Sequence, residues 1–120
     1  MTHSTHPLDP LTREEIIAAA GIVRAQGELS DQAWFETIAL QEPSKQALRE
    51  GNAKRQAFVC CYDPVTGQTH DGVADLAAGT LLNWRHVEGM MARIVGDEFA
   101  MGCAVVLQDE GFIAACAKRG

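Results

Sequence analysis

The sequence predicts an α+β fold in which one N-terminal helix packs on a four-stranded antiparallel sheet, followed by C-terminal helices. A capped stretch with helical periodicity comes first, over residues 12–26. Four strand-like runs follow, and short turns that contain glycine separate the last three of them. A helix followed by consecutive antiparallel strands is typical of a layered domain, in which the helix covers one face of the sheet.

The first helix is expected at residues 12–26, because residues 1–11 contain two prolines that disfavour an earlier start. Thr12 and Glu15 have the spacing of a capping box, in which each side chain bonds the backbone N–H of the other residue. Gly27 is expected to end the helix in the left-handed conformation, which glycine adopts most easily. Apolar residues at helical spacing predict one buried face, made of Ile16, Ile17, Ala20 and Val23.

Four strands are expected at residues 33–41, 55–62, 68–76 and 80–87. The last three are separated by turn sequences and are expected to form an antiparallel meander. The polar segment over residues 43–54 is expected to be an exposed loop. Four aromatic residues are expected in the core between helix and sheet: Trp34, Phe35, Phe58 and Trp84.

A mainly helical pattern returns after residue 89, and Asp109 is a suitable cap for a short last helix over residues 110–118. No strand-like run follows these helices. Their apolar faces therefore lack a sheet to cover, and we expect them to allow a homo-oligomer.

The composition is that of a globular domain, with 120 residues of which 47% are hydrophobic and 22% charged. The net charge is −6 and Lys and Arg do not cluster, so neither nucleic acid nor an anionic membrane surface is expected as a partner. The apolar runs are too short to span a bilayer, and the first residues lack the pattern of a secretory signal. We therefore expect a cytoplasmic protein with no membrane partner.

The four cysteines are Cys60, Cys61, Cys103 and Cys116. Their spacing fits neither a disulfide framework nor a zinc site. Cys60 and Cys61 are adjacent in a predicted strand, so their side chains should point to opposite faces of the sheet. We expect all four to be buried, reduced thiols, which is consistent with a reducing compartment.

The histidines predict no metal centre, because none of the H-x-H or H-E-x-x-H spacings occurs. His3 and His6 lie in the lead-in, whereas His70 and His86 fall on neighbouring strands and could meet across them. A thiolate of Cys60 or Cys61 beside His70 is conceivable as a nucleophile, but a strand cysteine that faces the core is favoured. No catalytic, cofactor-binding or metal-binding residue is assigned.

A set of short segments occurs in a fixed order along nearly the whole chain. The residues that carry it are His6, Pro7, Leu8, Asp9, Pro10, Leu11, Glu42, Pro43, Lys45, Arg55, Ala57, Phe58, Tyr62, Asp63, Gly67, Asp75, Leu76, Gly79 and Trp84. In this order the segments resemble the N2 domain of copper-containing, topaquinone-dependent primary amine oxidases. The end of the chain, Lys118-Arg119-Gly120, is similar to the end of a helical stretch in the family's next domain.

The resemblance implies two parts. Residues 1–88 are expected to form an N2-like, cystatin-like α+β domain, and residues 89–120 the helical start of an N3-like domain, cut off before its sheet. The family oxidises primary amines to aldehydes and releases ammonia and hydrogen peroxide. Its copper is held by three histidines, and its topaquinone is made from a tyrosine in an Asn-Tyr-Asp/Glu setting.

None of this machinery is carried over to the present residues. Tyr62 follows Cys61 and belongs to the N2 signature, and no H-x-H is present. Two local departures from the family are Val87-Glu88-Gly89, where Val-Pro-Gly is usual, and the adjacent Cys60-Cys61 pair.

We therefore expect a non-catalytic N-terminal fragment or truncated relative, which packs against the missing catalytic domain and has no cofactor of its own. Two alternatives remain open from the sequence. One is a free-standing protein-interaction module, and the other is a binder of small ligands between helix and sheet.

Overall fold

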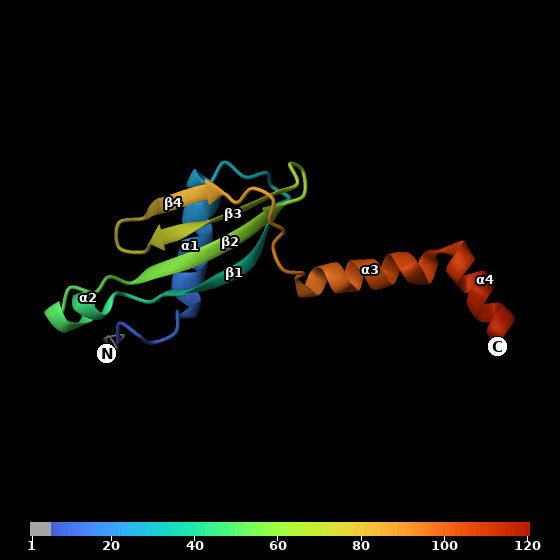
Figure 1. The fold of residues 1–120 in the computed structure, drawn as a ribbon, viewed down its shortest axis with the longest axis horizontal. Coiled ribbons are helices and arrows are strands. Elements are labelled where there is room, and N and C mark those ends of the chain that lie inside the picture. Colours follow the sequence, from blue (N-terminus) through green and yellow to red (C-terminus); the bar gives the residue numbers. More distant parts are fainter. Residues whose placement is uncertain (1–5) are drawn as a thin grey trace.

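The computed structural model describes residues 6–120 and confirms the α+β prediction (Figure 1). His3 and the rest of residues 1–5 lie outside the described residues. The elements in chain order are α1 (Arg13–Gln26), β1 (Trp34–Gln41), α2 (Lys45–Glu50), β2 (Gln56–Asp63), β3 (Gln68–Asp75), β4 (Thr80–His86), α3 (Gly96–Gln108) and α4 (Glu110–Arg119).

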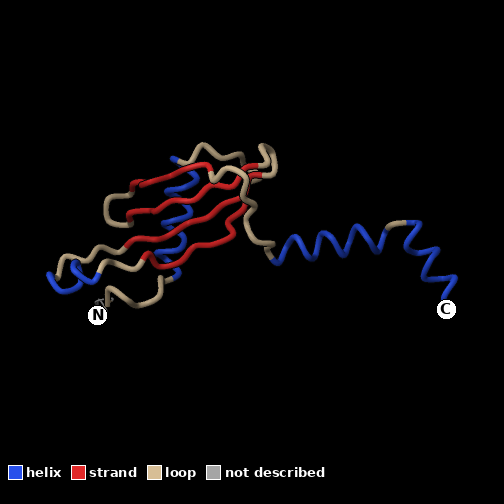
Figure 2. Tube along the Cα trace, in the orientation of Figure 1, coloured by secondary structure: helices blue, strands red, loops and turns tan. Residues whose placement is uncertain are grey.

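The four strands form one antiparallel sheet in the order β1-β2-β3-β4 (Figure 2). Every strand pairs with its neighbour in sequence, which confirms the predicted meander and extends it to β1. Helix α1 lies against one face of the sheet and crosses behind the strands in the view of Figure 1. Among residues 6–120, no helix packs on the opposite face, where the segment after β4 contacts Thr69 and Glu36.

The start of α1 is the predicted capping box. The backbone N–H of Glu15 donates to Oγ1 of Thr12 at 3.2 Å, and the N–H of Thr12 donates to Oε2 of Glu15 at 2.9 Å. Two N–H groups that the helix itself leaves unpaired are thereby satisfied. The cap explains why the helix begins directly after the proline-containing lead-in.

Replacing Thr12 by alanine should lower the free energy of unfolding by about 1 kcal/mol, because the N–H of Glu15 loses its acceptor. Urea unfolding followed by circular dichroism measures the change. Thr12→Ser retains the hydroxyl and is the matched control. Equal midpoints for the alanine and serine variants would show that the cap contributes nothing.

The buried face of α1 differs from the predicted one. Ala19 and Val23 are fully buried, whereas Ile16 and Ile17, both predicted to be buried, are 38% and 60% exposed. Successive helical residues are rotated by about 100°, so Ile17 lies well away from the stripe that Ala19 and Val23 form. The prediction that Ile17 faces the core is wrong because the periodic apolar residues covered more than one face.

Gly27 ends α1, but not in the predicted left-handed conformation. Its φ is −81°, and Glu28 has the positive φ of 54° instead. A Cβ atom on Gly27 would lie 2.7 Å from the carbonyl oxygen of Val23 and 3.3 Å from the ring of Trp84. Glycine is required here because the helix end and the tryptophan approach each other closely.

The core is made of small side chains. Between α1 and the sheet lie Ala57, Val59 and Cys61 of β2 and Ala74 of β3, each at most 1% exposed. Small residues let a helix approach a sheet closely, and their burial fills this interface. The alternative of a ligand cavity between helix and sheet therefore gains no support from it.

Two of the four aromatic residues predicted for this core lie elsewhere. Phe35 and Trp84 do pack against the buried cluster. Phe58 alternates with the buried Ala57 and Val59, so it lies on the face without a helix. Trp34 pairs with Tyr62 on that same face, with the ring centroids 5.5 Å apart.

The segment predicted as an exposed loop over residues 43–54 contains the short helix α2. The N–H of Ala47 donates to Oγ of Ser44 at 3.1 Å, and Gly51 ends the helix in the left-handed conformation with a φ of 70°. The two capping residues explain a helix where composition alone indicated a loop.

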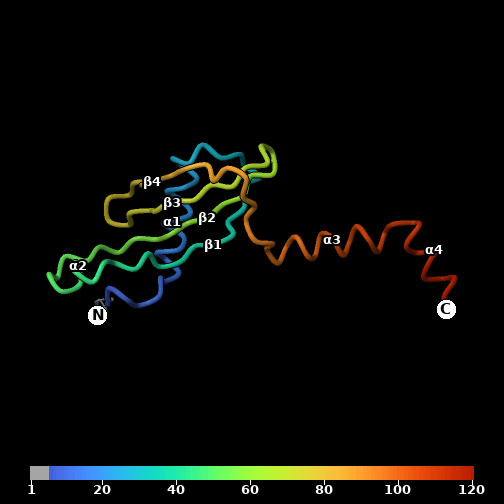
Figure 3. Tube along the Cα trace, in the orientation of Figure 1, coloured from blue at the N-terminus to red at the C-terminus, as the bar shows by residue number. Residues whose placement is uncertain are grey.

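Helices α3 and α4 project away from the sheet (Figures 1 and 3), and the described chain measures 68 × 31 × 25 Å. Every residue from 99 to 120 is exposed. Within residues 6–120, no single helix is long and apolar enough to cross a membrane, and α3 with α4, bent by 68° at their junction, meet that criterion of length and composition only as a pair.

Candidate functional site

His70 and His86 meet across β3 and β4, as the sequence suggested. They are direct partners in the antiparallel ladder, and their ring centroids lie 5.5 Å apart at an angle of 39°. The ring of His70 also stacks on Trp84 at 5.6 Å. Burial, and then the neighbouring His86, lower the pKa of His70. His70 is therefore neutral at neutral pH.

The adjacent cysteines point to opposite faces, as predicted. Cys61 is buried beneath α1, and burial raises the pKa of its thiol to about 12. Cys60 lies on the other face, where burial and then the carboxylate of Glu36 raise its pKa to about 11. Both thiols are protonated at neutral pH, so neither supplies the thiolate that a nucleophile beside His70 would need.

Cys103 and Cys116 contradict the prediction that all four thiols are buried. Both are exposed, and all four cysteines are free. They lie on α3 and α4, neither of which has a buried residue in the described part of the chain. The general tendency of free cysteine to be buried therefore did not predict the exposure of these two thiols.

The residues described here do not fit the copper and topaquinone that the resemblance implies. Across residues 6–120, His, Cys, Asp and Glu side chains nowhere gather in groups of three that could hold a metal ion. Asp63 lies near His70, but its oxygens are occupied by the N–H and hydroxyl of Ser30, at 2.8 and 2.6 Å. The ring of Tyr62 lies against Trp34.

Most of the signature residues have structural roles. Arg55 holds the lead-in to the domain: its Nη1 donates to the carbonyl oxygens of His6, Pro7 and Asp9 at 3.2, 3.3 and 2.7 Å. Its Nη2 donates to the carbonyl oxygen of Pro10 at 3.2 Å. We call this set of contacts the Arg55 clamp.

The clamp also reaches the first turn of α1. Nε and Nη2 of Arg55 donate to the two carboxylate oxygens of Glu15 at 3.0 and 2.7 Å. Hydrogen bonding to Arg55 lowers the pKa of Glu15, and Glu15 in turn raises the pKa of Arg55. Glu15 thus serves both the capping box and the clamp, which ties the lead-in, the helix and the start of β2 together.

Two signature aspartates shape the turns of the meander. Asp63 is 2% exposed and accepts hydrogen bonds from Ser30 and from the N–H of Val65 at 3.0 Å. Asp75 accepts from the N–H groups of Ala77 and Ala78 at 3.1 and 2.9 Å. These bonds, those of Ser30 first for Asp63 and that of Ala78 first for Asp75, lower the pKa of both carboxyls.

The other signature residues lie in turns, at element ends and in the sheet. Gly67 and Gly79 have positive φ values of 68° and 67° in the two turns. Nε1 of Trp84 donates to the carbonyl oxygen of Gly27 at 3.1 Å. The remaining residues are Leu8 and Leu11 in the lead-in, Glu42, Pro43 and Lys45 around the start of α2, Ala57 and Leu76 at the core, and Phe58 and Tyr62 on the face without a helix.

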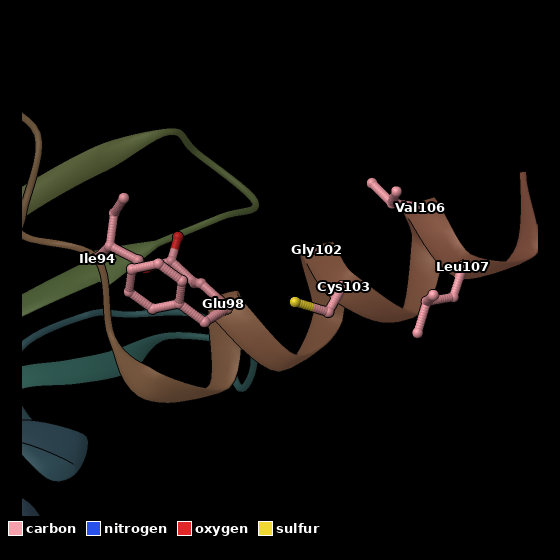
Figure 4. Close-up of a pocket in the computed structure, with 7 residues that line it drawn as sticks. Ile94, Glu98, Gly102, Cys103, Val106 and Leu107 are labelled. Carbon is pink, nitrogen blue, oxygen red and sulfur yellow. The ribbon is translucent and has the colours of Figure 1, made fainter. Parts of the chain in front are cut away.

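Helix α3 exposes large apolar side chains that no other part of residues 6–120 buries. A groove of about 510 Å³ is lined by Ile94, Glu98, Phe99, Gly102, Cys103, Val106 and Leu107 (Figure 4). Phe99 and Leu107 are 63% and 66% exposed. Met90, Met91, Met101, Val105, Phe112 and Ile113 continue the exposed apolar side chains along the linker and α4. We call this the α3–α4 apolar surface; so large an unpartnered surface is typical of a contact site.

The segment between β4 and α3 is anchored to the sheet by residues that the sequence did not single out. The N–H groups of Val87 and Ala92 donate to the carbonyl oxygen and the Oγ1 of Thr69 at 2.8 and 3.1 Å. Nε of Arg93 lies 2.7 Å from Oε1 of Glu36. These partners are 18 to 57 residues apart in sequence, so no local pattern could have revealed them.

Comparison with known proteins supports the resemblance. Residues 6–87 match a family model described as "Copper amine oxidase, N2 domain". A primary amine oxidase of Arthrobacter sp. (strain P1) is 37% identical over 118 residues, which cover 97% of this chain and 18% of the relative.

Primary amine oxidases of Lens culinaris and Pisum sativum are 27% and 28% identical, over 98% of this chain and 19% and 18% of their own lengths. The chain thus spans about a fifth of the length of these relatives. Because the similarity to the Arthrobacter protein covers 97% of the chain, it includes α3 and α4.

Proposed function

Because the chain belongs to the copper amine oxidase family, with residues 6–87 as its N2 domain, we propose that it is a non-catalytic, packing part of a primary amine oxidase. In this proposal the oxidation of a primary amine to an aldehyde, with release of ammonia and hydrogen peroxide, takes place in a catalytic domain outside these residues. The copper and topaquinone of the family would be held there. The present chain supplies a rigid domain and a surface for docking.

The observation that carries the proposal is the α3–α4 apolar surface. Its large apolar side chains are 42% to 80% exposed here, yet the chain aligns over 97% of its length with a relative of which it covers only 18%. Large apolar side chains in such number are stabilised by burial against a partner, at about 25 cal/mol per Å² of apolar area. The partner proposed is the remainder of the oxidase.

The first test concerns catalysis. The purified chain, incubated with Cu²⁺ and a primary amine, is expected to release no hydrogen peroxide, because the described residues form no three-ligand metal group. A coupled peroxidase assay provides the measurement, and the Arthrobacter oxidase serves as the positive control. Turnover, or the appearance of a quinone absorbance band, would contradict the proposal.

The second test concerns docking. The chain is mixed with the Arthrobacter oxidase from which the matching 118 residues have been removed. Replacing Phe99, Val106 and Leu107 together by serine should weaken association at least about 100-fold, because contacts of large apolar side chains dominate such interfaces. Sedimentation velocity measures the complex.

The matched control for docking replaces exposed apolar residues elsewhere, Ile17 and Val65, by serine. These residues lie on α1 and the β2–β3 turn, so association should be unchanged. If both sets of substitutions weakened association equally, or if the triple variant bound as tightly as the unchanged chain, the docking proposal would be wrong.

The same surface supports a second candidate, a free-standing module that associates with another copy through α3 and α4. The exposed, unpartnered Phe99, Val106 and Leu107 favour it. Size-exclusion chromatography over a dilution series discriminates between the two. A strict monomer at every concentration excludes this candidate and leaves docking to the oxidase.

A further inference from the structure

The histidine pair lies at the point where the linker leaves the sheet. His86 is the last residue of β4, and Val87, which follows it, continues the ladder by donating its N–H to the carbonyl oxygen of Thr69. Thr69 precedes His70 in β3, and its Oγ1 accepts the N–H of Ala92. The last rung of the β3–β4 ladder, formed by His70 and His86, is therefore continuous with two hydrogen bonds that hold the linker.

His70 is poorly placed to carry a charge. Its ring lies between those of Trp84 and His86, and within residues 6–120 its buried Nδ1 has no hydrogen-bond partner. A proton added to this imidazole would leave a charged N–H without an acceptor, which costs more than leaving a neutral group unpaired. Trp84 cannot give way easily, because its ring is held by the bond to Gly27 and lies close to Gly72.

The charged groups around the pair do not restore the ordinary pKa of His70, which stays lowered overall. From β2, Cys61 faces His70 as a neutral thiol, and the carboxylate of Asp63 raises the pKa of His70, but by less than burial and His86 lower it. From β4, Arg85 reaches to the opposite face, where its Nε lies 2.9 Å from Oδ1 of Asp71. Glu28, after α1, lines the same cleft of about 320 Å³ as both histidines and Asp63. His86 itself adds repulsion once it is protonated.

We propose that His70 and His86 form an acid-sensitive latch, which holds residues 87–92 on the sheet while the imidazoles are neutral and releases them when both are protonated. Two positive charges on one rung repel each other. Separation of the end of β4 from β3 lets water reach the buried Nδ1 of His70 and relieves this repulsion. The same separation breaks the bonds of Val87 and Ala92 to Thr69, so residues 87–92 leave the sheet while Arg93 stays bound to Glu36.

The sign of the pH dependence follows from linkage. The pKa of His70 in the closed state lies below the ordinary value of 6.5, so the open state binds the proton more readily. The closed state is therefore fully stable above pH 6.5 and loses stability as the pH falls below this value. The second contact that holds the linker, between Arg93 and Glu36, persists at low pH. Burial raises the pKa of Glu36, but hydrogen bonds from Thr37 and Arg93 lower this pKa overall.

Amide hydrogen exchange measured by NMR on the full chain tests the latch. After correction for intrinsic rates, protection of the Val87 and Ala92 amides should fall at least about tenfold between pH 7.5 and pH 5, which corresponds to about 1.4 kcal/mol. Protection of Val59, in the buried centre of the sheet, should stay the same, which separates latch release from global unfolding. The NMR titration of the His70 ring should have a midpoint below 6.5.

Two variants complete the design. His86→Gln removes the second charge at an exposed position, so it should retain most of the protection at pH 5. His6→Gln, in the lead-in, is the matched control and should behave as the unchanged chain does. The latch is overturned if Ala92 and Val87 keep their protection at pH 5, if His86→Gln loses it equally, or if His70 titrates at or above 6.5. It is a property of this chain alone, so its failure would leave the docking proposal unaffected.

Discussion

Replacement of Gly72 by alanine is expected to destabilise the domain by about 2–3 kcal/mol, the cost typical of an overpacked core position. A Cβ atom at this position would lie 2.8 Å from Cε3 and 2.9 Å from Cα of Trp84, and 3.0 Å from the carbonyl oxygen of Leu82. Two of these three atoms belong to the backbone of β4, so no side-chain rotation can relieve the contact. The bulge in the β3–β4 pairing opposite Gly72 would have to widen.

The chain offers a control of opposite sign for this substitution. Gly21 lies in the exposed middle of α1, and nothing lies within 4 Å of a Cβ atom built on it. Gly21→Ala should therefore stabilise the domain by about 1 kcal/mol, because alanine is the better helix former. Urea unfolding followed by tryptophan fluorescence measures both variants. If Gly72→Ala were neutral, Trp84 would not be packed as the structure shows.

Elements and topology were predictable from the sequence because their signals are local. The capping box of Thr12 and Glu15 marks the start of α1 to within one residue. Turn sequences after Asp63 and Asp75 mark the ends of β2 and β3. Short turns favour pairing of β2 with β3 and of β3 with β4, so this part of the sheet order follows from chain order. β1 is joined to β2 through residues 42–55, which contain α2, so no short turn determines its place.

The faces of the elements were less predictable. β2 carries apolar side chains on both faces, with Ala57, Val59 and Cys61 under α1 and Phe58 on the other side. Size suggested that the larger aromatic residue belongs in the core. The close approach of α1 instead selects the smaller side chains, and this selection depends on the three-dimensional packing rather than on any periodicity in the sequence.

For the candidate sites too, the positions of the residues were predictable but their contacts were not. The signature residues could be recognised from their order, and His70 and His86 could be placed on facing strands. What each residue contacts could not be derived, because the partners are distant in sequence: Arg55 reaches residues 40 to 49 positions earlier. The exposure of Cys103 and Cys116 was not predicted for a different reason: α3 and α4 bury no residue in the part of the chain that the structure describes.

The Arg55 clamp provides the second large expected effect. Arg55→Ala removes the donors that serve four backbone carbonyls of the lead-in and both carboxylate oxygens of Glu15. The side chains of Arg55 and Glu15 are only 18% and 21% exposed, so water replaces these bonds incompletely. The free energy of unfolding should fall by about 2–3 kcal/mol, as expected for charge-assisted hydrogen bonds in a partly buried site. Urea unfolding measures the loss.

Two further variants separate the clamp from a simple charge effect. Arg55→Lys keeps the positive charge but lacks the planar fork, so it should recover less than half of the loss. Arg49→Ala, at an exposed position of α2, removes the same charge and should change stability by no more than about 0.5 kcal/mol. If Arg55→Lys were as stable as the unchanged chain, attraction to Glu15 alone would account for the effect. The lead-in would then be held by something other than the hydrogen bonds of Arg55.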